Sequence, residues 1–135
     1  MKTLEELESD YWGDADPSSS KLIKKCYGLR RVPIDELETE DIRLLISQGI
    51  GLEHIIPLAI KLLEKNILAE GDYYEGDLLK AVLESNSRSW KDGLLIDKVK
   101  KLYENNVYMI EKADLTDDLK SKISDSYEQF KSELS

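Results

Sequence analysis

Apolar side chains recur every three or four residues along most of this 135-residue chain. This spacing gathers side chains on one face of an α-helix, whereas the alternation typical of β-strands is almost absent. The pattern predicts an all-α fold, a single-domain multi-helix bundle of about six to eight helices formed by the whole of residues 1–135. The expected helices span residues 3–12, 21–31, 40–48, 52–64, 78–84, 93–103 and 116–134.

Residues 52–64 form the most apolar of these segments and are predicted to be the central helix. Only a narrow stripe that contains Glu53, Pro57 and Lys61 is polar, so other helices must surround the rest. Pro57 has no backbone N–H and leaves the carbonyl of Glu53 without a helical donor. We therefore expect this helix either to begin near Ile55 or to be bent in its first turn.

Capping and turn residues set the expected ends of the helices. Turn formers fill residues 13–20, and Pro33 is expected to end the second helix. Thr39 is a suitable N-cap for the third helix. Gly49 is suited to closing that helix in the left-handed conformation, and Gly51 allows the chain to reverse before the central helix.

Two connections and one continuation are expected to be irregular. Residues 67–74 are too short and too rich in glycine for another helix, and residues 86–92 are expected to be a loop or an irregular helix. The helix over residues 93–103 is expected to continue, bent, through Met109 and Ile110.

Acidic residues outnumber basic ones by 28 to 19, and the formal net charge is −9. Such a molecule repels nucleic acid and anionic membranes, so neither is expected as its partner and a cationic protein is favoured. Charge also serves solubility, and composition alone favours that simpler explanation. Cys26 is the only cysteine and no stretch approaches the roughly 20 apolar residues that span a bilayer, so a cytoplasmic protein is expected.

One acidic segment, residues 70–77, combines four carboxylates and two tyrosines without a basic residue. Its acids do not have the spacing of a calcium-binding loop, so no metal is predicted there. We expect Asp77 to cap or flank the next helix, and the glycines of the segment to adopt positive φ angles. Of Tyr73 and Tyr74, one is expected to pack under the loop and the other to be exposed, as tyrosines at interfaces are.

No arrangement of catalytic residues is apparent. His54 is the only histidine, so neither a Ser-His-Asp or Cys-His pairing nor a multi-histidine metal site can form within one chain. Cys26 has no partner histidine, which favours a structural thiol. We therefore predict that the protein is not an enzyme and needs no cofactor. A metal-dependent hydrolase that uses the acids of residues 70–77 stays open as a different hypothesis.

Several short motifs lie at residues 11–13, 29–33, 40–46, 48, 51–52, 56–59, 66, 68–72 and 76–79. Together they resemble one known family, the immunity proteins of contact-dependent growth inhibition systems, of the helical CdiI type. The resemblance covers roughly residues 10–95. The resemblance implies an inhibitor that binds the C-terminal toxin domain delivered by a neighbouring cell, often a nuclease, and blocks or covers its active site.

We expect such a protein to act as a monomer that binds one toxin domain, and we expect that domain to be basic. The surface predicted to bind it combines acids and tyrosines of two segments: Asp14, Asp16, Glu70, Asp72, Tyr73, Tyr74, Glu75 and Asp77. The alternative left open is an acidic helical adaptor that binds a basic cellular partner through Tyr73, Tyr74 and the neighbouring carboxylates.

Overall fold

The structure, a computed structural model, describes residues 2–85 and 90–134. These residues form an all-α fold, as predicted, and the described part contains isolated β-bridges but no strand. The helices are α1 (Leu4–Glu8), α2 (Lys21–Leu29), α3 (Thr39–Ser47), α4 (Leu52–Lys65), α5 (Asp77–Glu84), α6 (Gly93–Asn105), α7 (Val107–Lys112) and α8 (Asp117–Glu133), with one 3-10 turn, η1 (Ile34–Glu36).

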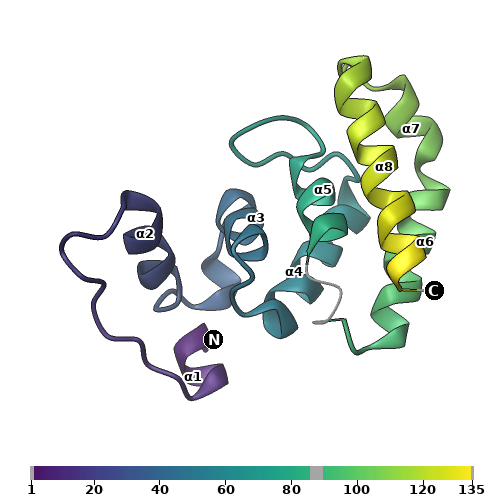
Figure 1. Ribbon diagram of the computed structural model, residues 1–135. Coiled ribbons are helices and arrows are strands. Elements are labelled where there is room, and N and C mark those ends of the chain that lie inside the picture. Colours follow the sequence, from purple (N-terminus) through teal and green to yellow (C-terminus); the bar gives the residue numbers. More distant parts are fainter. Residues whose placement is uncertain (1, 86–89, 135) are drawn as a thin grey trace.

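The helices follow one another from one end of the molecule to the other (Figure 1). At one end lie α1 and α2, in the middle α3, α4 and α5, and at the other end α6, α7 and α8. Helix α3 packs against α4 and α5, α4 also packs against α5 and α6, and α5 packs against α8. The predicted central helix therefore lies in the interior of the array, next to three others.

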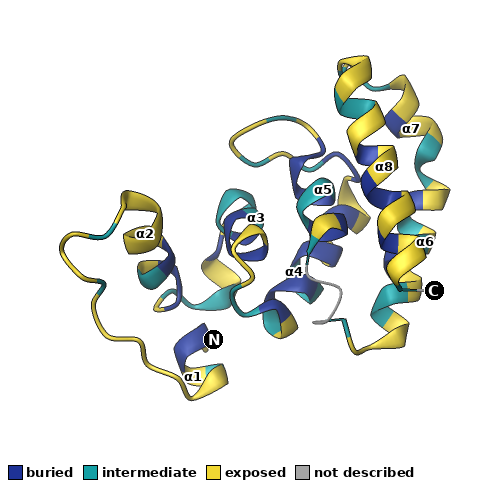
Figure 2. Ribbon diagram, viewed as in Figure 1, coloured by how far each residue is buried: buried dark blue, intermediate teal, exposed yellow. Residues whose placement is uncertain are grey.

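Helix α4 supplies much of the core (Figure 2). Its buried side chains are Leu52, Ile55, Ile56, Ala59, Ile60 and Leu63. Each fully buried leucine or isoleucine contributes on the order of 1.5–3 kcal/mol to the free energy of unfolding. The helix begins at Leu52, and Pro57 lies inside it, so the expected start near Ile55 is wrong. The backbone N–H groups of His54 and Ile55 both donate to the carbonyl of Gly51, at 2.9 Å.

The start of α4 is in contact with the first helix of the chain. Gly51 adopts a left-handed φ of 62° as the N-cap of α4. A β-carbon placed on Gly51 would lie 2.7 Å from Cδ2 of Leu4, which is fully buried. Glycine is therefore needed here both for its backbone conformation and for the space that Leu4 occupies.

The first helix is shorter than predicted. It was expected over residues 3–12 but ends at Glu8, where Ser9 adopts a left-handed φ of 51°. The reason is an interaction with the end of α2. Arg30, which is 1% exposed, pairs with Glu8 and donates to the carbonyl of Asp10 at 2.5 Å. Arg31 donates to the carbonyl of Gly13, and these contacts hold the chain out of the helical path.

Capping explains most of the remaining ends. The N-cap of α3 is Glu38 rather than the predicted Thr39, because the backbone of Glu38 is extended and it forms a capping box with Asp41. Thr116 caps α8, where its hydroxyl oxygen accepts a hydrogen bond from the N–H of Leu119 at 3.2 Å. The chain breaks between α6 and α7 at Asn106, consistent with the bend that was expected.

Helix α8 closes the far end of the core. Its buried residues Ile123, Tyr127 and Phe130 follow the helical spacing, and Trp90 packs edge-to-face on Phe130 at 5.2 Å between ring centroids. The connection predicted over residues 86–92 falls partly outside the described residues, because only 90–92 of it belong to them.

Candidate functional site

The acidic segment predicted as a binding surface forms a closed loop between α4 and α5, drawn as a wide arch above the middle helices in Figure 1. Its two ends meet, because Glu70 and Glu75 form an isolated antiparallel bridge. The N–H of Gly76 also donates to the carbonyl of Leu68 at 3.2 Å. Gly76 has a φ of 92°, which a side chain would oppose, so the reversal into α5 depends on glycine.

Asp77 holds this loop from the inside. Its side chain is buried, with 4% of the residue exposed. One carboxylate oxygen accepts from the N–H of Gly71 at 2.7 Å, and the other accepts from those of Tyr73 at 3.1 Å and Tyr74 at 3.4 Å. Asp77 was predicted both to flank the next helix and to belong to the exposed surface. It is the first residue of α5, one position earlier than the predicted start at Leu78, with Gly76 as the N-cap. Its burial places it beneath the surface.

An ion pair on α3 fixes the side of the loop that faces this helix. Arg43 donates two hydrogen bonds to the carboxylate of Glu40, at 2.6 and 2.7 Å. Glu40 in turn accepts from the N–H of Asp72 at 2.9 Å, and the guanidinium of Arg43 lies 4.6 Å from the ring centroid of Tyr73. Hydrogen bonds from Arg43 hold the pKa of Glu40 below its usual value, so the carboxylate is charged at neutral pH. The loop is therefore docked on α3 before any partner binds.

Gly71 is needed for space rather than for its backbone conformation. Positive φ was expected for the glycines of the segment, and among the described residues Gly76 shows it while Gly71 does not. A β-carbon on Gly71 would fall well inside van der Waals contact with the carboxylate of Glu40 and 3.1 Å from that of Asp77. Only a glycine lets both carboxylates approach the loop backbone together.

The exposed residues of the loop, which form its outer face, include three carboxylates and one aromatic ring. Glu70, Asp72 and Glu75 are exposed, and 70% of Tyr73 is accessible to solvent. Tyr74 is half-buried, and its burial raises the pKa of its phenol. The expectation of one exposed and one packed tyrosine therefore holds for Tyr73, while Tyr74 is covered only in part.

The two remaining predicted residues lie elsewhere. Asp14 and Asp16 belong to the segment that runs beyond α2, on the side away from α3 and from the loop (Figure 1). Asp14 accepts a hydrogen bond from Arg31 at 3.0 Å. Asp16 accepts from the N–H and hydroxyl of Ser18, which hold the pKa of Asp16 below its usual value. These two acids do not form one surface with residues 70–77.

Sequence reasoning missed the roles of Glu40 and Arg43. Their spacing of three residues places both on one face of a helix, which is a signal for an ion pair. The contact of that pair with a loop 32 residues further along the chain has no local signature.

Within residues 2–85 and 90–134, no group of three or more histidine, cysteine, aspartate or glutamate side chains is placed to hold a metal ion. No helix in the same part of the chain is long and apolar enough to cross a membrane.

Fold and loop together define an acidic all-α protein with a preformed surface loop of carboxylates and tyrosines. Residues 6–102 match the family of CDI immunity proteins, the immunity proteins of contact-dependent growth inhibition, and the chain belongs to this family. The match extends the motif resemblance, which covers roughly residues 10–95, at both ends. No curated protein matches the chain.

Proposed function

We propose that this protein neutralises the C-terminal toxin domain of its own contact-dependent growth inhibition system by binding that domain through the outer face of loop 70–77. Membership of the immunity family supports an immunity role. The observation that carries the choice of surface is the docked loop, in which Tyr73 is exposed, as are Glu70, Asp72 and Glu75.

Preorganisation is the first physical support. Binding costs free energy whenever a loop must be ordered, and a loop already held by Asp77 and Glu40 avoids most of that cost. Tyr73 then offers a rigid aromatic group of the kind that anchors protein interfaces. The surrounding carboxylates complement a cationic surface on the partner.

A nuclease is the toxin activity that this surface fits best. A nuclease presents cationic groups to the phosphates of its substrate, and a protein of net charge −9 is steered toward such groups at long range. The inhibitor acts without chemistry of its own, as a monomer that covers the active site of one toxin molecule in the cytoplasm. Asp14 and Asp16, which lie away from the loop, contribute to the long-range potential rather than to the contact.

Co-expression with the toxin domain encoded beside this gene tests the proposal. Cells that produce the toxin domain should grow when this protein is present and stop growing without it. Failure of the wild-type protein to restore growth, together with no measurable complex, would refute the proposal.

A pair of matched variants tests the surface. The double substitution Asp72→Lys with Glu75→Lys should slow association with the toxin domain, and most strongly at low salt, because both carboxylates are exposed on the loop. The control is Asp35→Lys with Glu36→Lys on η1, which changes the net charge equally at two other exposed positions. Equal slowing by both pairs would show that the field of the whole molecule, rather than this loop, directs binding.

A further inference from the structure

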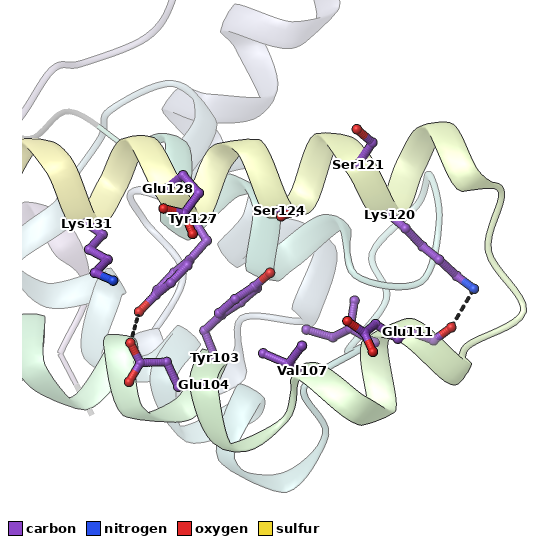
Figure 3. Close-up of a pocket in the computed structure, with 11 residues that line it drawn as sticks. Tyr103, Glu104, Val107, Glu111, Lys120, Ser121, Ser124, Tyr127, Glu128 and Lys131 are labelled. Carbon is purple, nitrogen blue, oxygen red and sulfur yellow. Dashed lines mark hydrogen bonds between the residues drawn. The ribbon is translucent and has the colours of Figure 1, made fainter.

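A cleft lies between α6, α7 and α8, with a volume of about 510 Å³ (Figure 3). Tyr103 of α6 and Tyr127 of α8 stack in it, with ring centroids 3.9 Å apart and planes inclined by 14°. Both tyrosines are buried, at 7% and 3% exposure. Together with Val107 and Ile110 they give the cleft an aromatic and aliphatic floor.

Carboxylates surround this floor. Glu104 accepts a hydrogen bond from the hydroxyl of Tyr127, while Glu111 and Glu128 are exposed at the cleft. Burial raises the pKa of Tyr127, and Glu104 and Glu128 raise it further, which indicates a negative local potential. Two lysines also line the cleft. Lys120 donates to the backbone carbonyl of Glu111 at 2.7 Å, at one end, and Lys131 lies at the other (Figure 3).

This cleft is distinct from loop 70–77 in two ways. Helix α8 separates them, since Ile123 faces Gly76 of the loop whereas Ser124 and Glu128 line the cleft. All residues that line the cleft lie between 103 and 131, beyond the residues 6–102 that match the family. The cleft is therefore a feature of this chain outside the matched region.

We propose that the cleft between α6, α7 and α8 binds one arginine or lysine side chain of the toxin domain and so contributes to the choice of toxin. The aliphatic stem of such a side chain fits the floor of Tyr103, Tyr127 and Val107. Glu111 and Glu128 lie on opposite sides of the stacked rings (Figure 3), so the charged head pairs with one of these two carboxylates. This inference rests on the proposed function, because it takes the toxin domain as the occupant.

Calorimetric titration of the full chain with an inactivated form of the neighbouring toxin domain tests the inference. The variant Glu111→Lys with Glu128→Lys should bind about tenfold more weakly or worse, with faster dissociation. The control is Asp125→Lys with Glu133→Lys, two exposed acids of α8 that do not line the cleft, and it should stay within about threefold of the wild-type affinity. Circular dichroism melts should show all forms folded.

The outcomes separate the cleft from the proposed function. If the cleft variant binds with wild-type affinity, or if the cleft and control variants are weakened equally, the cleft does not bind a toxin side chain. The proposed function is untouched by either result. A wild-type protein that does not bind the toxin domain refutes the proposed function and the cleft with it.

A double-mutant cycle supplies a second measurement. Basic residues of the toxin domain are replaced by alanine one at a time, and each variant is titrated with the wild-type and cleft-variant proteins. One of these toxin variants should lose affinity for the wild-type protein but no further affinity for the cleft variant. If every toxin variant loses the same affinity for both proteins, no side chain occupies the cleft and the inference fails.

Discussion

Replacing Asp77 by alanine should destabilise the fold by removing the acceptor that organises loop 70–77. The carboxylate accepts three backbone hydrogen bonds, at 2.7, 3.1 and 3.4 Å, of which the longest is the weakest. A hydrogen bond to a charged group contributes about 1.5–3 kcal/mol, although water can reach parts of this loop and replace some of the loss. We therefore expect the free energy of unfolding to fall by roughly 2–4 kcal/mol. For a chain of this length each kcal/mol lowers Tm by roughly 3–4 °C, so the expected decrease is about 7–15 °C.

Thermal and urea denaturation followed by circular dichroism measure this loss. The matched control is Asp72→Ala in the same loop, whose exposed carboxylate should matter by no more than about 0.5 kcal/mol. Hydrogen exchange adds a local readout, since the amides of Gly71 and Tyr73 should lose protection in the Asp77 variant. If Tm stays within about 1 °C of the wild type and both amides keep their protection, Asp77 does not hold the loop and the reasoning is refuted.

Three further predictions follow from the same structure. The pKa of Glu40 is held below its ordinary value of 4.5 by Arg43, so its stabilisation is fully present above about pH 4.5 and is lost as the pH falls through the lower folded value. Glu40→Gln should therefore lower Tm at neutral pH and flatten the acid side of a Tm-against-pH curve, and an unchanged curve would contradict this. Leu63→Ala should cost about 2–5 kcal/mol in urea unfolding, because this side chain is 1% exposed, and a cost under 1 kcal/mol would show that the site collapses or is not packed. Tyr73→Ala should keep Tm within about 2 °C, since the ring is 70% exposed, while it weakens toxin binding about tenfold or more; retained affinity would remove Tyr73 from the interface.

The regular part of the fold could be predicted from the sequence because its signals are local. The apolar run predicted over residues 52–64 corresponds to α4, which ends one residue later. The helix predicted over residues 116–134 corresponds to α8, and Thr116 is its cap. Both depend on side-chain spacing and on one capping residue, which a short window of sequence contains.

The end of α1 was predicted wrongly because it depends on distant residues. Leu7 and Tyr11 continue a helical spacing, yet Tyr11 lies outside α1 and is 67% exposed. Arg30 and Arg31, about 20 positions away along the chain, donate hydrogen bonds to the backbone carbonyls of Asp10 and Gly13. Those contacts hold residues 10–13 outside a helix. The spacing of apolar residues does not reveal hydrogen bonds from distant side chains, so it predicts too long a first helix.

The sequence predicted which residue types form the candidate site, but not how the loop that carries them is held. The sequence contains the carboxylates and tyrosines of residues 70–77, and the structure confirms that Glu70, Asp72 and Tyr73 are exposed. That Asp77 faces inward could not be predicted, because an aspartate before a helix is equally suited to the surface. Its three amide partners come from a loop whose path only the folded chain defines.

The contact between Leu4 and Gly51 has a consequence for the order of folding. Leu4 leaves the ribosome before Gly51, because the glycine against which its side chain rests lies 47 positions later in the chain. A helix as short as Leu4–Glu8 has no stability in isolation. We therefore expect Leu4 to dock only after the corner between α3 and α4 has formed, so that its contact with Gly51 is made late in folding.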